Sequence, residues 1–338
     1  MQSLSTRLFS PVRSITKSTA TTNNSEKIVI VAISDTHNLH HDIRDPFPRK
    51  QGDIFIHAGD LTVKGTEQEL RDCLQWIYEN TKGFTHKFYI GGNHDRDLQR
   101  QDVLSRLEKE FPDLKYLHKR TAEVTIKGRK LKIYGNSQSP FHSNGNRAFT
   151  YQRETSKNVW SGIPRNVDIL ITHAPPYDIC DEHEKKLGCK KLLQACWKAK
   201  PKLHICGHIH TGRLAELIKW KGKKGEMEKI DNYYYTDKRP GSSHSPQSSS
   251  PEIAKQKSET RKLLSLFRPV DKVSGVRLHR SPSMSLVSET RTLSEGVLGQ
   301  LKAVIVPSNR PGYTTAVNAC SKNRKKDGMS RGATLILM

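Results

Sequence analysis

The sequence predicts an α/β fold in which helices cover the faces of a β-sheet. Short apolar runs typical of buried strands alternate about five times with stretches of helical periodicity. The apolar runs are continuous rather than alternating, as expected of strands that are buried on both faces of a parallel sheet. A chain of 338 residues also has enough length to bury a core, in one large domain or two smaller ones.

The first half of the chain contains three strand candidates. They are the stretches "KIVIVAISDTH", "DIFIHAGD" and "HKFYIGGNHD". Between the second and third, residues 66–80 predict a helix, because apolar residues recur on one face and Thr66 with Glu69 forms a capping-box pattern. A second helix is expected over about residues 98–111.

The second half continues the alternation. The stretches "AEVTI" and "RKLKIYG" predict a hairpin through Lys127-Gly128, and a helix is expected near residues 151–160. Two further buried strands, "VDILITHAPP" and "KLHICGHIH", flank a helix in "CKKLLQACWKAK". Near the end, "AVIVP", "YTTAVNAC" and "ATLILM" regain strand character, so we expect the chain to return and finish the sheet.

The net charge of +23 is concentrated toward the C-terminus. Basic side chains exceed acidic ones by 3 in residues 1–25, by 8 in residues 26–215 and by 12 in residues 216–338. We therefore expect a domain over 26–215, a Ser-rich basic disordered insertion over 216–302, and C-terminal strands over 303–338 that complete the domain. The charge of the insertion would permit a nucleic-acid or protein partner, although dispersed basic residues are also typical of solvated segments.

Residues 1–25 are rich in serine and threonine, with three basic side chains and no acidic one. This composition fits either a disordered tail or a mitochondrial transit peptide. No apolar run approaches the 18 or so residues of a membrane span, so we expect a soluble protein. We expect it to be intracellular, and cytoplasmic rather than mitochondrial unless residues 1–25 are a transit peptide. The six cysteines show neither a C-x-x-C pair nor zinc-finger spacing and fit reduced thiols.

Polar side chains follow each of the five buried strands. They are Asp35-Thr36-His37, Gly59-Asp60, Asn93-His94-Asp95, Thr172-His173 and His208-Ile209-His210. Because sites in open α/β sheets form beyond the carboxyl ends of the strands, these clusters are expected to face one place. Oxygen and nitrogen ligands without thiolate fit Mn, Fe or Zn in a paired site. Two such ions can activate a nucleophile and neutralise phosphate oxygens.

The series "DTH", "GD", "GNHD", "TH" and "GHIH" resembles the calcineurin-like metallophosphoesterase superfamily. "HAGDLT", "ILITHAPP", "PKLHICGHIHTG" and the late "TTAVN" resemble its metallophosphoesterase domain-containing branch, which is similar to class III cyclic-nucleotide phosphodiesterases. The resemblance covers about residues 27–215 and the strands near 311–338. It implies a sandwich of two mixed β-sheets flanked by helices.

The resemblance also implies roles for individual residues. One divalent ion would be bound by Asp35, His37 and His210, the other by Asn93, His173 and His208, with Asp60 bridging the two. His94 would lie beside the scissile phosphate and assist the leaving group. Asp95 would orient its neighbours through hydrogen bonds.

The implied activity is hydrolysis of a small-molecule phosphoester by a hydroxide that bridges the metals. The residues "LTVKG" after Asp60 lack the arginine of the protein-phosphatase branch, so protein phosphatase activity is disfavoured. The resemblance to the metallophosphoesterase domain-containing branch implies a phosphodiester, such as a cyclic nucleotide, rather than a phosphomonoester. The alternative is a weakly active metal- or nucleotide-binding protein whose basic insertion recruits partners.

Several other residues near these motifs are interpreted as structural. His57 and His204 are expected to be packed, hydrogen-bonded histidines, and Cys206 a buried thiol. The loop candidates His40, His41, Asn136, His142 and Arg147 are expected to be exposed to solvent.

Overall fold

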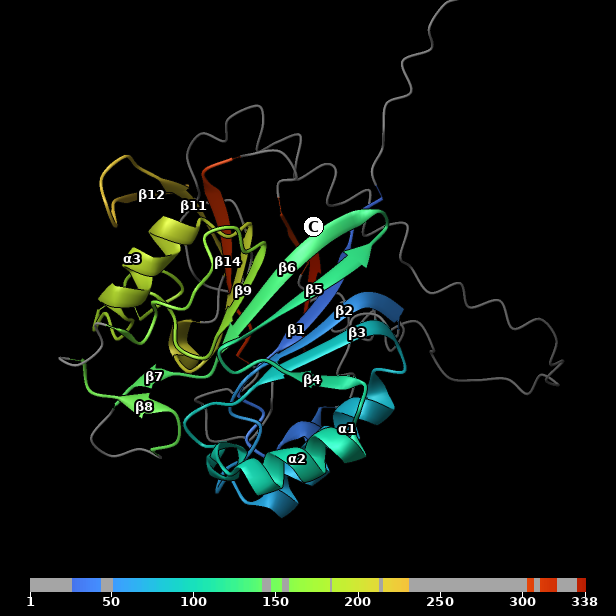
Figure 1. Cartoon of the computed structure of the whole chain (residues 1–338). Coiled ribbons are helices and arrows are strands. Elements are labelled where there is room, and N and C mark those ends of the chain that lie inside the picture. The colour runs from blue at the N-terminus through green and yellow to red at the C-terminus, as the bar shows by residue number, and fades with distance from the viewer. Residues whose placement is uncertain are drawn as a thin grey trace, which may run out of the picture.

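The computed structural model describes residues 26–43, 51–141, 147–153, 158–182, 184–212, 215–230, 303–306, 311–320 and 333–338. These residues form two mixed β-sheets that pack face to face, with helices on both outer faces (Figure 1). The sandwich of two mixed sheets implied by the resemblance is therefore confirmed. In contrast, the alternation of elements alone suggested one sheet with helices on its faces.

The first sheet has six strands. In spatial order they are β13 (Ala303–Ile305), β15 (Thr334–Leu337), β1 (Val29–Ile33), β2 (Gln51–Ala58), β3 (Gly83–Ile90) and β4 (Leu114–Tyr116). Strands β1 to β4 are parallel to one another, and β15 pairs antiparallel with β1. The carboxyl ends of β1, β2 and β3 therefore lie at the same edge.

The second sheet has seven strands. In spatial order they are β12 (Met227–Ile230), β11 (Ala215–Trp220), β14 (Tyr313–Asn318), β10 (Leu203–Cys206), β9 (Ile169–Thr172), β6 (Arg129–Asn136) and β5 (Arg120–Ile126). The predicted hairpin is present, since Lys127 and Gly128 link β5 to β6 with φ angles of 50° and 74°. Two residues with positive φ are what a tight hairpin turn requires. A separate two-stranded sheet pairs β7 (Ser139–Pro140) with β8 (Thr150–Tyr151).

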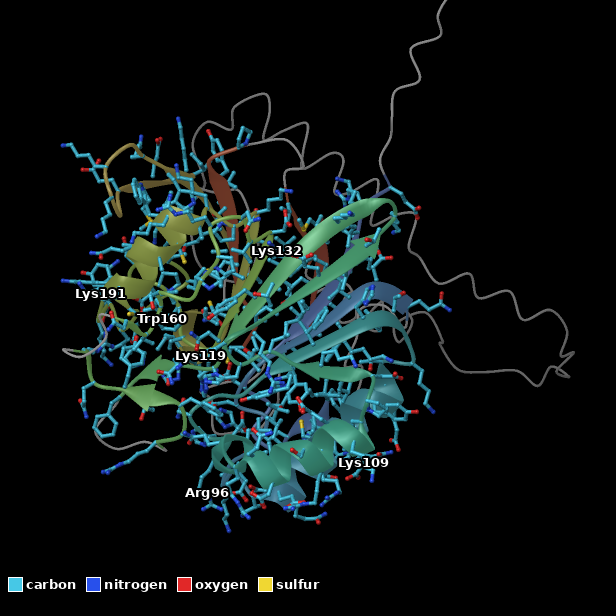
Figure 2. The ribbon with its side chains drawn as sticks, viewed as in Figure 1. Arg96, Lys109, Lys119, Lys132, Trp160 and Lys191 are labelled. Atoms are coloured by element: carbon cyan, nitrogen blue, oxygen red, sulfur yellow. The ribbon has the colours of Figure 1, made fainter. Side chains whose placement is uncertain are left out.

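Alternation along the strands builds three apolar layers. In β1, Ile30 faces the core between the sheets, whereas Val31 faces the helices α1 (Glu67–Asn80) and α2 (Gln101–Glu110). The helix α3 (Lys190–Ala199) covers the outer face of the second sheet. Figure 2 shows the charged side chains of the helices, such as Lys109 and Lys191, on the outside of these layers.

Helix α1 begins as the sequence predicts. The Thr66 hydroxyl accepts a hydrogen bond from the backbone N–H of Glu69, and the Glu69 carboxylate accepts one from the backbone N–H of Thr66. This reciprocal pair satisfies two N–H groups that the first turn leaves unpaired. Within the described ranges, no helix has the length and hydropathy needed to cross a bilayer.

Two expectations differ from the structure. Tyr151, where the expected helix was to begin, pairs instead with Pro140 in the β7–β8 sheet; Arg153 and Asn158 have 3₁₀ conformation, and residues 154–157 lie outside the described residues. Strand pairing there overrides the local helical pattern. Strands β11 and β12 lie within the segment expected to be a disordered insertion from residue 216, so the ordered sheet continues to Ile230. Residues 231–302 of the predicted insertion and residues 1–25 lie outside the described residues.

Candidate metal centre

The polar residues expected at the five strand ends come together where the two sheets meet. Strands β1, β2 and β3 of the first sheet and β9 and β10 of the second each contribute. Three groups of potential metal ligands have donor atoms within 4.8 Å of one another: Asp35, His37 and His210; His37, Asp60 and His94; and Asp60, His173 and His208. Asn93 joins them through its Oδ1 atom, 3.1 Å from Nε2 of His173. The structure thus brings all seven predicted ligands together.

The first group is compact and lies on the side of β1, with Asp35 and His37 buried and His210 partly exposed. Nε2 of His210 lies 3.4 Å from Oδ1 of Asp35 and 3.4 Å from Nε2 of His37. The Asp35 carboxylate also accepts hydrogen bonds from the backbone N–H of His208, at 3.0 and 3.1 Å. Asp35 therefore connects the end of the first sheet to the end of the second.

Asp60 lies between the two predicted metal positions. Its Oδ1 atom is 3.4 Å from Nε2 of His173, and its Oδ2 atom is 3.6 Å from Nε2 of His37. The ring centroids of His173 and His208 are 4.9 Å apart. One carboxylate thus presents one oxygen to each group, which is the placement that a bridging ligand needs.

Backbone carbonyls orient two of the histidines. Nδ1 of His37 lies 3.2 Å from the Thr62 oxygen, and Nδ1 of His173 lies 3.0 Å from the Ala58 oxygen. Because a carbonyl only accepts hydrogen bonds, each Nδ1 carries a proton and each Nε2 is the nitrogen turned toward the centre. This is the arrangement of a histidine that binds a metal through Nε2.

The backbone is strained at the predicted ligands. The φ angles of Asp35, His37, Asp60 and His208 are 56°, 44°, 53° and 65°. Side chains with a Cβ atom rarely adopt this left-handed region, and each such residue costs on the order of 1–3 kcal/mol. The rest of the fold holds these residues in conformations that aim their side chains at one point.

The electrostatics of the centre favour positive charge. Asp35 is fully buried and Asp60 is nearly so. Burial lowers the pKa of His173, but the charge and hydrogen bond of Asp60 and the charge of Asp35 outweigh it and raise the pKa to about 10. Two buried carboxylates therefore stabilise a cation here, and the oxygen and nitrogen donors fit divalent Mn, Fe or Zn.

The predicted catalytic residues have different surroundings. His94 is partly exposed, with its ring edge-on to His37 at 4.5 Å and its Nδ1 atom 2.9 Å from the Val63 oxygen. Asp95 is fully buried and accepts four hydrogen bonds, from the backbone N–H groups of Leu61, Thr62 and Gly92 and from the Thr62 hydroxyl. Asp95 therefore joins the loop after β2 to the loop after β3, as expected of an orienting residue.

Sequence reasoning missed several groups that support the centre. The carbonyls of Thr62 and Val63 are backbone atoms whose positions no side-chain pattern reveals. Asn318, at the end of β14, donates to the Ile209 oxygen at 3.0 Å and so holds the segment between His208 and His210. Asn318 is the last residue of the "TTAVN" motif, which resembles the family near the C-terminus, so this motif could have marked Asn318 as a residue that supports the centre.

The interpretation of nearby residues is confirmed in part. His57 and His204 are buried and lie 3.1 and 2.8 Å from the hydroxyls of Thr36 and Thr172, and Cys206 is a buried thiol. The expectation of solvent exposure is wrong for His40 and Asn136, which are buried. Asn136 ends β6 and belongs to the sheet rather than to a loop. His41 and Arg147 are exposed, as expected, and His142 lies outside the described residues.

Comparisons with known proteins point to one family. The sequence profile of the calcineurin-like phosphoesterases matches residues 28–212. Metallophosphoesterase domain-containing protein 1 of Homo sapiens is 34% identical over 207 residues, covering 54% of this chain and 60% of that protein. A protein of Emericella nidulans, described as a probable rhamnogalacturonate lyase C, is 38% identical over 207 residues, which are 59% of this chain and 18% of that protein.

The chain spans less than two thirds of the length of both curated relatives. Among solved structures, the protein TT1561 of Thermus thermophilus has a TM-score of 0.41 and 15% identity, covering 56% of this chain and 84% of that chain. The family profile covers more than half of the chain, and its range contains every predicted ligand. The chain belongs to the calcineurin-like phosphoesterase family.

Proposed function

We propose that this protein is a metal-dependent phosphoesterase that hydrolyses a small-molecule phosphodiester, with cyclic nucleotides as the first substrates to test. Its family supports a hydrolase of phosphoric esters. The observation that carries the proposal is the position of Asp60, whose two oxygens face His37 and His173 at 3.6 and 3.4 Å. A carboxylate shared in this way suits a pair of divalent ions.

Each residue has a defined part in this proposal. Asp35, His37 and His210 would hold one ion and Asn93, His173 and His208 the other, with Asp60 contributing to both. Bound there, two divalent ions would lower the pKa of water and offset the charge of the phosphate oxygens. Mn, Fe and Zn all suit this donor set.

His94 is the proposed proton donor to the leaving oxygen. The Val63 carbonyl accepts from Nδ1, so proton transfer falls to Nε2. The T-shaped contact with His37 keeps the ring beside the metal ligands. General acid catalysis of this kind contributes roughly 10²–10⁴ in rate.

The proposal is tested by hydrolysis of bis(p-nitrophenyl) phosphate with added Mn²⁺, compared with p-nitrophenyl phosphate. We expect metal-dependent turnover that is faster on the diester, and a loss of at least 10²-fold in the His208→Ala and Asp60→Asn variants. His86→Ala and Asp102→Asn, which change a histidine and an aspartate outside the cluster, should stay within about twofold of wild type. Absence of metal-dependent turnover in the wild type would overturn the enzyme assignment, and faster monoester hydrolysis would overturn the diester preference.

The segment after β12 has a separate proposed part, as a recruiter of nucleic acid or protein partners through its basic charge. Deletion of residues 231–300, beyond the last residue of β12, should leave turnover intact and remove partner binding. Partner binding that survives the deletion would assign recruitment to another surface.

A further inference from the structure

A second group of potential metal ligands lies apart from the strand ends. His40 and His41 in the short 3₁₀ helix η1 (His40–Asp42) face Asp72 on α1. Nε2 of His40 is 3.0 Å from Oδ2 of Asp72, and Nε2 of His41 is 3.3 Å from Oδ1. The donor atoms of all three residues lie within 4.8 Å of one another.

The group is anchored on one side and open on the other. His40 is fully buried and its ring centroid lies 5.5 Å from that of Trp76, one turn along α1 from Asp72. The side chains of His41 and Asp72 are 60% and 51% exposed. The protein therefore fixes one imidazole by packing and leaves water access on the other face.

His40 reaches the group through one ring nitrogen. Its Nε2 atom contacts Asp72, whereas its Nδ1 atom is buried and has no hydrogen-bond partner in the structure. Burial, followed by the charge of His41, lowers the pKa of His40 and keeps the imidazole in the neutral form that a metal ion binds.

We propose that His40, His41 and Asp72 bind a divalent transition metal ion of the zinc type, at a site separate from the catalytic cluster. Two imidazoles and one carboxylate suit zinc and its neighbours, whereas Mg²⁺ and Ca²⁺ prefer sites made of oxygen ligands. Donor atoms that already lie 3.0–3.3 Å apart need little movement to surround one ion. Solvent supplies the remaining ligand positions through the exposed face.

The position of the site suggests its effect. The segment from His37 to His40 leads from a predicted catalytic ligand to this group, and Asn38 in between donates to Glu69 of α1 at 2.7 Å. An ion held by η1 and α1 together would add a second link between that segment and the helix. We expect it to stabilise the loop after β1.

The test is equilibrium dialysis of the full chain against Zn²⁺, with bound metal counted by atomic absorption. The double variant His41→Ala/Asp72→Asn should bind one ion fewer per chain than wild type, because both substitutions remove exposed ligands without disturbing the core. Asp42→Asn, an exposed aspartate in η1, is the matched control and should bind as wild type does. Equal counts in wild type and the double variant would overturn the proposal.

A second measurement uses Trp76 as a reporter and does not depend on the double variant. Co²⁺ is paramagnetic and quenches a nearby indole, so it should lower Trp76 fluorescence, measured as the difference between wild type and Trp76→Phe. Prior addition of Zn²⁺ should prevent the quenching. Absence of Trp76 quenching, or quenching that persists in the single variant Asp72→Asn, would contradict a site at these residues.

Discussion

His37 and His210 face each other through Nε2 atoms 3.4 Å apart, although 173 residues separate them in the sequence. The Thr62 carbonyl holds the proton of His37 on Nδ1, so its Nε2 presents a lone pair toward His210. A proton on Nε2 of His210, or a cation between the two nitrogens, makes this close approach favourable. The nearby Asp35 carboxylate makes a cation the favoured partner.

Removal of bound metal is therefore expected to destabilise the protein. An ion at 100 times its dissociation constant stabilises the folded state by about 2.7 kcal/mol. For a domain of this size, each kcal/mol shifts Tm by roughly 2–4 °C, so chelation should lower Tm by about 5–10 °C. Differential scanning calorimetry with and without EDTA measures the shift. In Asp60→Asn the response to EDTA should shrink, and an unchanged wild-type Tm would contradict the prediction.

Gly207 is expected to tolerate no side chain. A Cβ atom there would lie 2.3 Å from Oδ2 of Asp35 and 2.3 Å from Oγ of Ser34, so Gly207→Ala must displace the loop that carries His208. A displacement of about 1 Å at reacting groups costs on the order of 10²-fold, so kcat/KM should fall by about that factor. Gly222→Ala is the control, because a Cβ atom there meets nothing within 4 Å. Equal activity of the two variants would show that the loop accommodates the methyl group.

Asp95 is expected to stabilise the folded protein as well as to hold the loops after β2 and β3 in place. Its carboxylate accepts from backbone N–H groups on both loops, at 2.8 Å from Gly92 and 3.0 Å from Thr62. Asp95→Asn replaces one acceptor oxygen by a donor and leaves a buried N–H without a partner, which should cost about 1–3 kcal/mol in the free energy of unfolding. Urea denaturation measures the change, and the exposed Asp102→Asn should stay within about 0.5 kcal/mol. A loss no larger than that of Asp102→Asn would argue against the orienting part of Asp95.

The positions of the metal-binding candidates could be predicted because local signals determine them. Continuous apolar runs predicted where β1 and β2 end, and Asp35 and Asp60 each lie two residues beyond the last residue of their strand. Parallel pairing then brings the carboxyl ends to one edge, so convergence follows from the strand assignment. Residue type and position along the chain were sufficient for this step.

The remaining features depend on contacts between distant parts of the chain. Strand β14 lies between β10 and β11, a pairing that no periodicity near residues 313–318 indicates. Tyr151, expected to begin a helix, ends β8 for the same reason, since pairing with Pro140 decides its conformation. Asp72 meets His40 only because α1 packs beside the segment after β1, and the sequence around either residue gives no sign of the other.

His94 is expected to act as an acid on the leaving group rather than as a metal ligand. If Nε2 donates a proton to the departing oxygen, His94→Asn should slow diesters with poorly acidic leaving groups by about 10²–10⁴ and slow p-nitrophenyl esters much less. The measurement is kcat across aryl phosphodiesters whose phenols differ in acidity, with metal content determined for each preparation. The slope of log kcat against leaving-group pKa should steepen in the variant while metal content stays unchanged. An equal fall in kcat for all the phosphodiesters would exclude proton donation. A loss of bound metal in the variant would instead make His94 a metal ligand, which is possible because its donor atoms lie close to those of His37 and Asp60.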